Sequence, residues 1–209
     1  MRDTFRETNV IKQVLHISYD VTVPRQIDHD ARRATIDAAV IAIAAESGFA
    51  AVTIRAVAQR IGSSTSAVTH YVSTRDELLG NAVRREVDAR LDDADAAIGE
   101  RTGDPALRAL VEWAMFGAPE SGRRFWLAAV LGAEHQPVLC AELDRFNVWW
   151  DARVRDLLAQ AGVDDPESAA DVLNVMVDGL VVNSFYGGSP WVEQRREGLL
   201  DTVWRALAL

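Results

Sequence analysis

The chain has 209 residues, of which 49% are hydrophobic and 25% are charged, and its formal net charge at pH 7 is -9. This apolar content is enough to bury a core and argues against wholesale disorder. No apolar run approaches the roughly 20 residues that span a bilayer, and residues 1–20 carry charges instead of the apolar segment of a secretory signal. The single cysteine, Cys140, excludes an intramolecular disulfide framework. We therefore expect a soluble, cytoplasmic protein without a membrane partner.

The acidic residues are unevenly distributed along the chain. Residues 24–91 hold nine arginines and eight acidic residues, whereas residues 92–209 hold ten arginines and twenty acidic residues. Phosphate binding depends on local cations, so an acidic body does not prevent a near-neutral N-terminal part from contacting nucleic acid. The charge distribution permits DNA binding without demonstrating it.

Helical spacing begins after an N-terminal extension, residues 1–24, to which we assign no ordered element. Asp30 is expected to cap a first helix that ends at Gly48, with Phe49 packing back beneath it. The apolar residues of this helix recur at positions that share one face. They are Ile36, Val40, Ile43 and Ala44.

Two short helices follow and are joined by a Gly-Ser turn. Thr53 opens the first of them and Gly62 ends it, and Ser63 or Ser64 caps the second, which is expected over residues 65–71. Three helices in about 45 residues with this turn are typical of a helix-turn-helix. We therefore predict a DNA-binding head over residues 25–75.

The remainder, residues 76–209, is predicted to form a larger helical domain. Thr74 caps a connecting helix that runs to Leu91, and Asp92-Asp93 follow its end. Beyond Pro105 no strand-like alternation occurs, and prolines stand at the predicted helix starts. The predicted helices cover residues 106–117, 121–134, 137–161, 166–186 and 191–207. The fold class is therefore all-α.

The region from Asp30 to Leu91 resembles the TetR family of repressors. Residues 53–64 read TIRAVAQRIGSS and residues 68–79 read VTHYVSTRDELL. The family pattern has a Thr before an apolar helix, then Ala, then Gly in the turn, an aromatic pair, and a cation and an acid before Leu-Leu. Two positions depart from it, because Thr69 stands where the family usually has Tyr and Arg75 where it often has Lys.

The resemblance implies a double-stranded DNA operator as partner, with the recognition helix in the major groove. Thr53 would offer a phosphate seat at a helix N-terminus, and Arg55 and Arg75 would be the main phosphate cations. The helix itself carries no Arg or Lys. The full set of expected DNA-binding residues is Thr53, Arg55, Ser63, Ser64, Thr65, Ser66, Thr69, His70, Tyr71 and Arg75.

The same resemblance implies a small-molecule effector bound among the helices of the second domain, in a mostly apolar pocket. Large apolar side chains at helical spacing belong to a plain core more often than to a pocket, and this alternative holds for each expected residue. The expected pocket residues are Trp113, Phe116, Trp126, Leu127, Phe146, Met176 and Asn183. Asn147, Asn174, Asp178 and Asn183 are polar groups within apolar stretches, and any that is buried needs a partner or a ligand.

A homodimer is predicted from the helix over residues 166–186, which is apolar on more than one side and so must be covered all round. Pairing this helix and the one over residues 137–161 with their copies would form a four-helix bundle. The expected interface residues are Trp149, Arg153, Leu157, Leu173, Val177, Leu180 and Val181. Full burial within one chain is the alternative.

The sequence does not favour an enzyme, a cofactor or a metal. It contains no Gly-rich phosphate loop, Cys-x-x-Cys, His-Glu-x-x-His or Gly-x-Ser-x-Gly motif. We interpret Glu134, His135 and Glu142 as polar residues of the protein surface, and Cys140 as a buried structural thiol. The favoured hypothesis is a repressor that a largely apolar ligand releases from a palindromic operator. The alternatives are an activator with the same fold and a helical scaffolding protein whose helix-turn-helix has lost DNA affinity.

Overall fold

The computed structural model describes residues 28–183, 185, 190–207 and 209, and the side chains of 190–197 fall outside the description. The predictions for residues 1–24 and for the end of the helix at Tyr186 therefore lie outside the described residues. Over the described ranges the chain is helical and contains no strand, as predicted. None of the helices searched in these ranges is long and apolar enough to cross a membrane.

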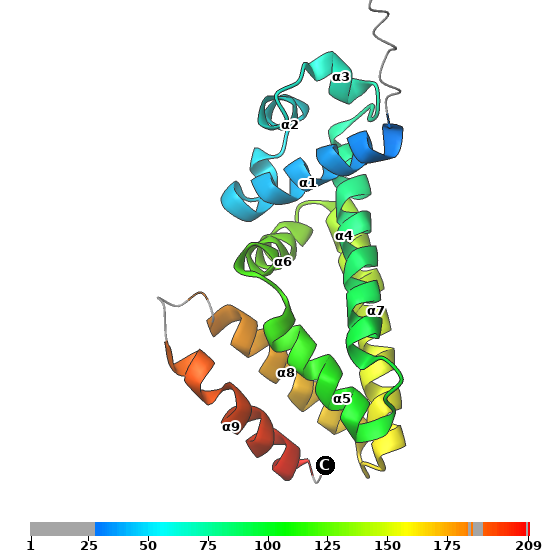
Figure 1. The fold of residues 1–209 in the computed structure, drawn as a ribbon, viewed down its shortest axis with the longest axis vertical. Coiled ribbons are helices and arrows are strands. Elements are labelled where there is room, and N and C mark those ends of the chain that lie inside the picture. Colours follow the sequence, from blue (N-terminus) through cyan, green and yellow to red (C-terminus); the bar gives the residue numbers. More distant parts are fainter. Residues whose placement is uncertain (1–27, 184, 186–189, 208) are drawn as a thin grey trace, which may run out of the picture.

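The head consists of α1 (His29–Ser47), the short 3-10 turn η1 (Phe49–Ala51), α2 (Ile54–Arg60) and α3 (Thr65–Thr69). It lies at one end of an elongated molecule, with α3 at the tip (Figure 1). The predicted cap of α1 was two residues late, because the carboxylate of Asp28 accepts the backbone N–H groups of Asp30 and Ala31. Gly48 ends α1 with a φ of 77°, and Phe49 is buried below it, as predicted.

The body begins with α4 (Arg75–Ile98), which runs from the head down one side of the molecule beside α7 (Pro137–Ala161) (Figure 1). The Thr74 hydroxyl accepts the N–H of Glu77, as the predicted cap requires. The prediction that this helix ends at Leu91 was wrong. Asp92 and Asp93 lie on its exposed surface, where a carboxylate does not interrupt a helix, and the break comes at Gly99 with a φ of 58°.

The other body helices are α5 (Gly103–Glu112), α6 (Glu120–Ala133), α8 (Pro166–Asn183) and α9 (Pro190–Ala206). A π-helical turn, η2 (Trp113–Gly117), extends α5. Of the helix predicted over residues 166–186, the structure describes residues 166–183 as helical. Trp204 of α9 donates to a carboxylate oxygen of Asp104, so the end of α9 packs against the start of α5.

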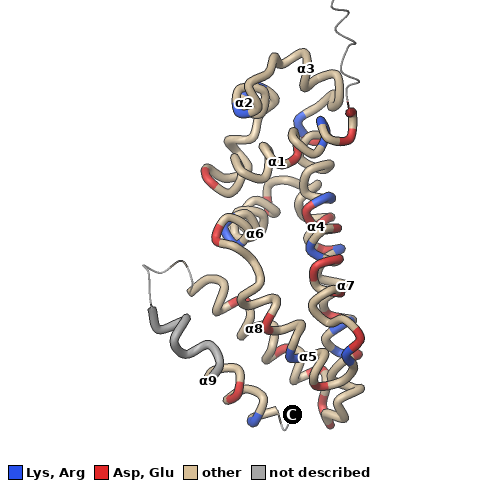
Figure 2. Tube along the Cα trace, in the orientation of Figure 1, with Lys and Arg blue, Asp and Glu red and all other residues tan. Residues whose placement is uncertain are grey.

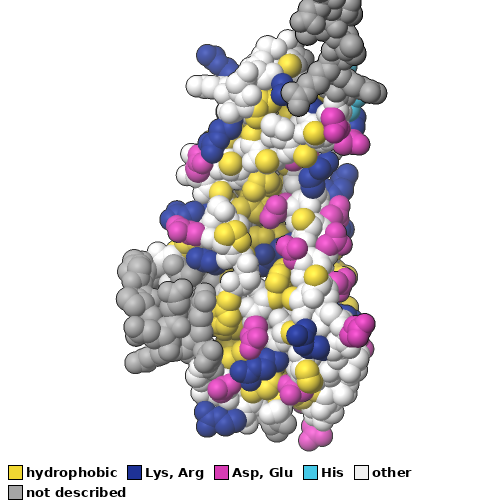
Figure 3. All heavy atoms as spheres, viewed as in Figure 1, with side chains coloured by type: hydrophobic (Ala, Val, Ile, Leu, Met, Phe, Trp, Pro, Cys, Tyr) yellow, Lys and Arg dark blue, Asp and Glu magenta, His cyan; other side chains and the backbone are white. Residues whose placement is uncertain are grey.

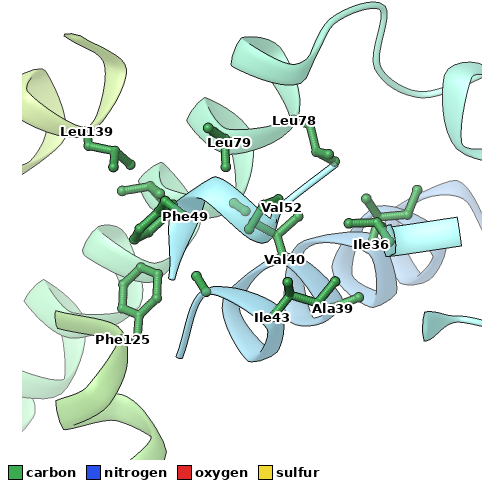
Figure 4. Packing of buried hydrophobic residues seen from close by; sticks show 14 of the residues in the cluster. Ile36, Ala39, Val40, Ile43, Phe49, Val52, Leu78, Leu79, Phe125 and Leu139 are labelled. Carbon is green, nitrogen blue, oxygen red and sulfur yellow. The ribbon is translucent and has the colours of Figure 1, made fainter. Parts of the chain in front are cut away.

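The head does not have an apolar core of its own. Buried residues of α1, η1, α2 and α3 form one cluster with residues of α4, α6 and α7. The rings of Phe49 and Phe125 meet at a centroid distance of 5.6 Å, and Leu139 packs close by (Figure 4). The predicted boundary after residue 75 is thus crossed by continuous packing between α1 and α6.

A second cluster fills the opposite end of the body, between the end of α4 and α5, α7, α8 and α9. Phe146 of α7 packs against both clusters. The close approach of α4 to α7 depends on Gly80, where an added Cβ would lie 2.9 Å from the Cγ2 of Val138. A side chain at this position would therefore force the two helices or Val138 to shift.

Replacing Gly80 with Ala is expected to lower the free energy of unfolding by about 1–3 kcal/mol, because overpacking outweighs the higher helix propensity of Ala. Urea denaturation measures the change. Gly179→Ala in α8 is the matched control, since nothing lies within 4 Å of its Cβ position. That variant is expected to be stabilised by up to about 1 kcal/mol. Equal stabilisation of both variants would contradict the close approach at Gly80.

Candidate nucleic-acid interface and ligand cavity

The helix-turn-helix is built by two caps and one left-handed glycine. The Thr53 hydroxyl accepts the N–H of Ala56 at the start of α2, and the Ser64 hydroxyl accepts the N–H of Ala67 at the start of α3. Between them Gly62 has a φ of 62°, a conformation that a side chain resists. Val57 and Val68 are buried where the two helices pack together. These local features fix the direction in which α3 leaves the head.

The outer surface of α3 carries hydroxyl groups and no charge. Thr65, Ser66 and Thr69 are exposed, and the hydroxyls of Ser64 and Ser66 lie 2.9 Å apart. The Thr69 hydroxyl donates to the Ser66 carbonyl oxygen. Figure 2 shows α3 without an acidic or basic residue. Short hydroxyls can contact base edges or phosphates, whereas long-range attraction to phosphate must come from neighbouring elements.

Three arginines lie on the elements next to α3. Arg55 is exposed on α2 and forms no ion pair within the described part of the chain. Arg32 of α1 donates to the Ser63 hydroxyl at 2.7 Å, which ties α1 to the turn before α3. The guanidinium of Arg33 lies 5.8 Å from the ring centre of Tyr71. By contrast, Arg60 forms a bidentate ion pair with Glu46.

Sequence reasoning missed Arg32 and Arg33, although their adjacency near the start of the first helix was a usable signal. Both residues come close to α3 only because α1 passes beside the turn, and this crossing is set by tertiary packing.

An aromatic group closes the C-terminal side of α3. The Tyr71 hydroxyl and Nδ1 of His29 are hydrogen-bonded at 3.1 Å, and the rings of His70 and Tyr71 meet edge-on with centroids 5.1 Å apart. His70 is exposed, whereas Tyr71 is half-buried against the head core. Tyr71 therefore supports the head whatever it contacts outside.

Arg75 is placed differently from the sequence prediction. Its Nε donates to the Val52 carbonyl at 2.7 Å, and its Nη2 donates to the Phe49 carbonyl at 2.6 Å. Its Nη1 lies 3.3 Å from the side-chain oxygen of Gln136. The guanidinium thus joins η1, α4 and the start of α7 from a half-buried position. We remove Arg75 from the expected phosphate contacts, because reaching a phosphate would break these bonds.

The body contains a cavity of about 790 Å³ between α4, α6, α7 and α8. It opens to the surface beside exposed residues such as Val130 and Val148, and Figure 3 shows apolar side chains exposed over the middle of the face in view. Most of its wall is apolar or aromatic. The volume is in the range of small-molecule sites. The described residues contain no group of three or more His, Cys, Asp or Glu that could hold a metal ion.

Three of the expected pocket residues, Trp126, Leu127 and Phe146, line this cavity. The other four are not part of its wall, namely Trp113, Phe116, Met176 and Asn183. Sequence reasoning missed two basic residues of the wall, Arg90 and Arg123, because both are long side chains that reach inward from amphipathic helices.

The polar groups of the wall fall into two kinds. Asn174 is half-buried and satisfied, because its side-chain oxygen accepts from Trp150 Nε1 at 2.7 Å and its amide donates to Asp151 at 3.2 Å. Asn147 and Asp178 are exposed near the opening. Partial burial nevertheless raises the pKa of the Asp178 carboxyl above its usual value.

Asn183, the remaining polar residue singled out from the sequence, donates to the Gly179 carbonyl. The interpretation of Cys140 as a buried thiol was wrong, since its side chain is exposed. The neighbouring Asp144 carboxylate raises its pKa, which disfavours the reactive thiolate.

The expected dimer residues also divide into groups. Leu157, Leu173 and Leu180 belong to the core of a single chain, with exposures of 1%, 0% and 8%, so they are unavailable to a partner. Val177 and Val181 line the cavity. Trp149 is half-buried against Phe146, whereas Trp150 is buried, and Arg153 lies near Asp95 and Asp156.

The large hydrophobic residues that are exposed on the same two helices are different ones. They are Val148, Val172, Val175 and Val182.

Comparison with known proteins agrees with this architecture. A family model described as "Tetracyclin repressor-like, C-terminal domain" matches residues 120–209. The HTH-type transcriptional regulator PksA of Bacillus subtilis (strain 168) is 40% identical over 62 residues, which are 30% of each protein. The HTH-type transcriptional regulator BetI of Rhizobium meliloti (strain 1021) is 29% identical over 168 residues, 76% of this chain and 80% of that protein.

Among solved structures, a transcriptional regulator from Rhodococcus sp. Rha1 superposes with a TM-score of 0.72 and 28% identity. The superposition covers 84% of this chain and 95% of that one. The likeness therefore extends over head and body together.

The hydrogen bonds of Arg75 generate a stability prediction. Arg75→Met is expected to lower the free energy of unfolding by about 1–3 kcal/mol, because two carbonyl acceptors at the junction of η1 and α4 lose their donor. Urea denaturation monitored by circular dichroism measures the loss. Arg55→Met removes the same charge from an exposed site and is expected to change stability by less than about 0.5 kcal/mol. Equal stability of the two variants would contradict the assigned role of Arg75.

Proposed function

Because this chain belongs to the TetR family of DNA-binding transcriptional regulators, we propose that it is a repressor which binds a palindromic operator as a homodimer and leaves it when a small, largely apolar effector enters the body. The observation that carries the proposal is the pairing, in one chain, of an exposed hydroxyl-bearing α3 at the tip with a cavity of about 790 Å³ in the body.

The DNA contacts we propose follow from exposure and charge. The N-terminal part of α3 would face the bases through Thr65, Ser66 and Thr69. Arg55, which forms no ion pair with the described residues, would neutralise a phosphate, and Thr53 would place the N-terminus of α2 near the backbone. Arg32 would add a second cation next to Ser63, since its contact with that hydroxyl leaves its charge uncompensated.

The dimer is proposed because a helix face remains apolar after the chain has folded. Val175 and Val148 are 74% and 71% exposed. Exposed apolar side chains that are grouped on one side of a domain are typical of an interaction surface. A twofold axis beside α8 would bury Val172, Val175 and Val182 against their copies and place two heads on one side of the assembly. Recognition of two half-sites requires the heads to be about 34–36 Å apart.

Release requires the effector to favour one arrangement of the heads over another, because equal affinity for both shifts nothing. The structure offers two connections between the cavity and the head. Helix α4 reaches the cavity at Arg90 and the head at Arg75, and α6 lines the cavity and packs beneath α1. The proposed effector acts through these helices.

Operator binding is tested with the DNA upstream of the protein's own gene, titrated with salt. Arg55→Met is expected to weaken binding and to flatten the slope of log K against log salt by about one unit, since one phosphate contact is lost. Arg75→Met is the matched control, and once its folding has been verified it is expected to keep the wild-type slope. Absence of binding at low salt would favour the scaffolding alternative, and a reporter gene distinguishes repression from activation.

The dimer is tested by placing a charge on the proposed interface. Val175→Asp is expected to convert a dimer to a monomer in sedimentation experiments, because an unpaired carboxylate would be buried between the copies. Ala96→Asp, at an exposed position of α4 away from α8, should leave the mass unchanged. A dimeric Val175→Asp variant would show that this face of α8 is not the interface.

A further inference from the structure

Arg90 of α4 is a charged group in an aromatic environment at the wall of the cavity. Its guanidinium carbon lies 4.7 Å from the ring centre of Trp113, 4.8 Å from that of Trp126 and 5.6 Å from that of Phe146. Burial lowers the pKa of Arg90 to about 10. The side chain therefore remains positively charged near neutral pH, and the ring faces stabilise part of this charge.

No anion compensates this charge within the described part of the chain. Glu86 stands one turn earlier on α4, at the spacing that favours an ion pair, yet no salt bridge forms between the two. Glu86 and Asp93 act on Arg90 only from longer range. The Nε of Arg90 is buried and has no hydrogen-bond acceptor among the described residues. Arg90 is half-buried, and a partly desolvated charge without a paired counter-ion is costly, so an anion that enters the cavity would be favoured beside it.

Two further donors around the cavity lack an acceptor. They are Nε of Arg123 and the indole N–H of Trp126, both buried and both on residues of the wall. Every unsatisfied buried atom of the described wall residues is thus an N–H donor. A molecule that completes this environment must supply acceptors.

The acidic residues of the wall do not fill this need. Asp151 is already paired with Arg155 at 2.9 Å. Asp144 accepts from the Cys140 thiol, and both Asp144 and Asp178 are exposed near the opening. Among the wall residues, the buried atoms without a partner are therefore donors, whereas the carboxylates are either paired or exposed. A cationic ligand would be disfavoured, because the guanidinium of Arg90 already occupies the ring faces against which such a ligand would pack.

We propose that the effector is an organic monocarboxylate with an apolar body, whose carboxylate binds the guanidinium of Arg90 while its apolar part lies against Leu127, Trp150 and Val177. This assignment rests on the proposed function, because it names the chemical class that enters the proposed effector cavity. The planar guanidinium suits a carboxylate, since it can donate two parallel hydrogen bonds. The anion would supply the missing counter-charge, and α4 would carry the result toward the head.

The test compares three probes with the same ten-carbon chain and different head groups: decanoate, decan-1-ol and decyltrimethylammonium, each below its micellar concentration. Binding to the full-length protein is measured by calorimetry and by tryptophan fluorescence. Decanoate is expected to bind at least about tenfold more tightly than the alcohol, as a charge-assisted hydrogen bond implies, and the ammonium more weakly than either. Arg90→Met should lose this preference and retain the affinity for decan-1-ol, whereas Arg101→Met should behave as the wild type.

The ranking of the probes on the wild-type protein decides the matter even if Arg90→Met fails to fold. Equal or tighter binding of the alcohol or the ammonium, or no binding of decanoate, overturns the proposal. Unchanged decanoate affinity of a folded Arg90→Met variant overturns it as well. Operator binding measured without any probe distinguishes failure of the proposed effector class from failure of the proposed regulator function. Loss of the decanoate preference with intact DNA binding refutes only the effector class, and absent DNA binding with an intact preference refutes only the regulator function.

Discussion

The arrangement of the molecule depends on how α4 is held. Its first residue, Arg75, is bonded to two carbonyls of the head, and Arg84 and Arg85 follow about two and a half turns later. Arg84 pairs with the buried Glu142 of α7, and Arg85 pairs with the buried Asp37 of α1. Glu142 also pairs with Arg145. For Asp37 the described residues provide Arg85 alone as an ion-pair partner, so removing Arg85 would leave this carboxylate without one in a poorly hydrated place. Burial already raises the pKa of Asp37, so the charged form there depends on Arg85. α4 is therefore fixed to the head and the body at once, and the distance from Arg75 to Arg90 along it is about 22 Å.

A second connection runs through packing instead of charge. Phe49 and Phe125 join η1 to α6 inside one apolar cluster, and the next residue of α6, Trp126, lines the cavity. An added Cβ at Gly132 would come within 3.1 Å of Leu139 in α7 and 3.6 Å of Phe49 in the head, so the end of α6 also lies close to both. Close-packed interfaces switch between discrete arrangements and do not deform continuously. Any molecule that moves α6 in the cavity must therefore move α1 or break this contact.

Local signals were sufficient to predict most of the fold, because caps, glycine turns and apolar periodicity act within a few residues. Thr53, Gly62 and Thr74 stand where the sequence predicted them.

The errors arose where the outcome depended on distant parts of the chain. Asp92 and Asp93 look like a break but are simply on the solvent side of α4. The role of Arg75 was mistaken because a flexible arginine near a helix-turn-helix can reach either a phosphate or a carbonyl, and only the position of η1 decides between them. The sequence predicted an apolar cavity and three of its wall residues. It did not predict that the Arg90 side chain points into the cavity, because its helical spacing also allowed an ion pair with Glu86.

The charge distribution connects the two proposed activities. The recognition helix has no cation, so attraction to DNA rests on a few flanking arginines, while residues 92–209 carry twice as many acidic residues as arginines. The described helices of this range form the body and not the tip (Figure 2). Few phosphate contacts imply a modest non-specific affinity, which leaves specificity to short-range contacts that depend on the exact placement of both heads. Under these conditions a small displacement is enough to lose the operator. A coupling free energy of about 1–3 kcal/mol, which is typical of allosteric proteins, then suffices for release. One charge-assisted contact between a carboxylate and Arg90 has a comparable magnitude. Such a contact supplies the difference that the switch requires to the extent that it forms only in the arrangement that does not fit the operator.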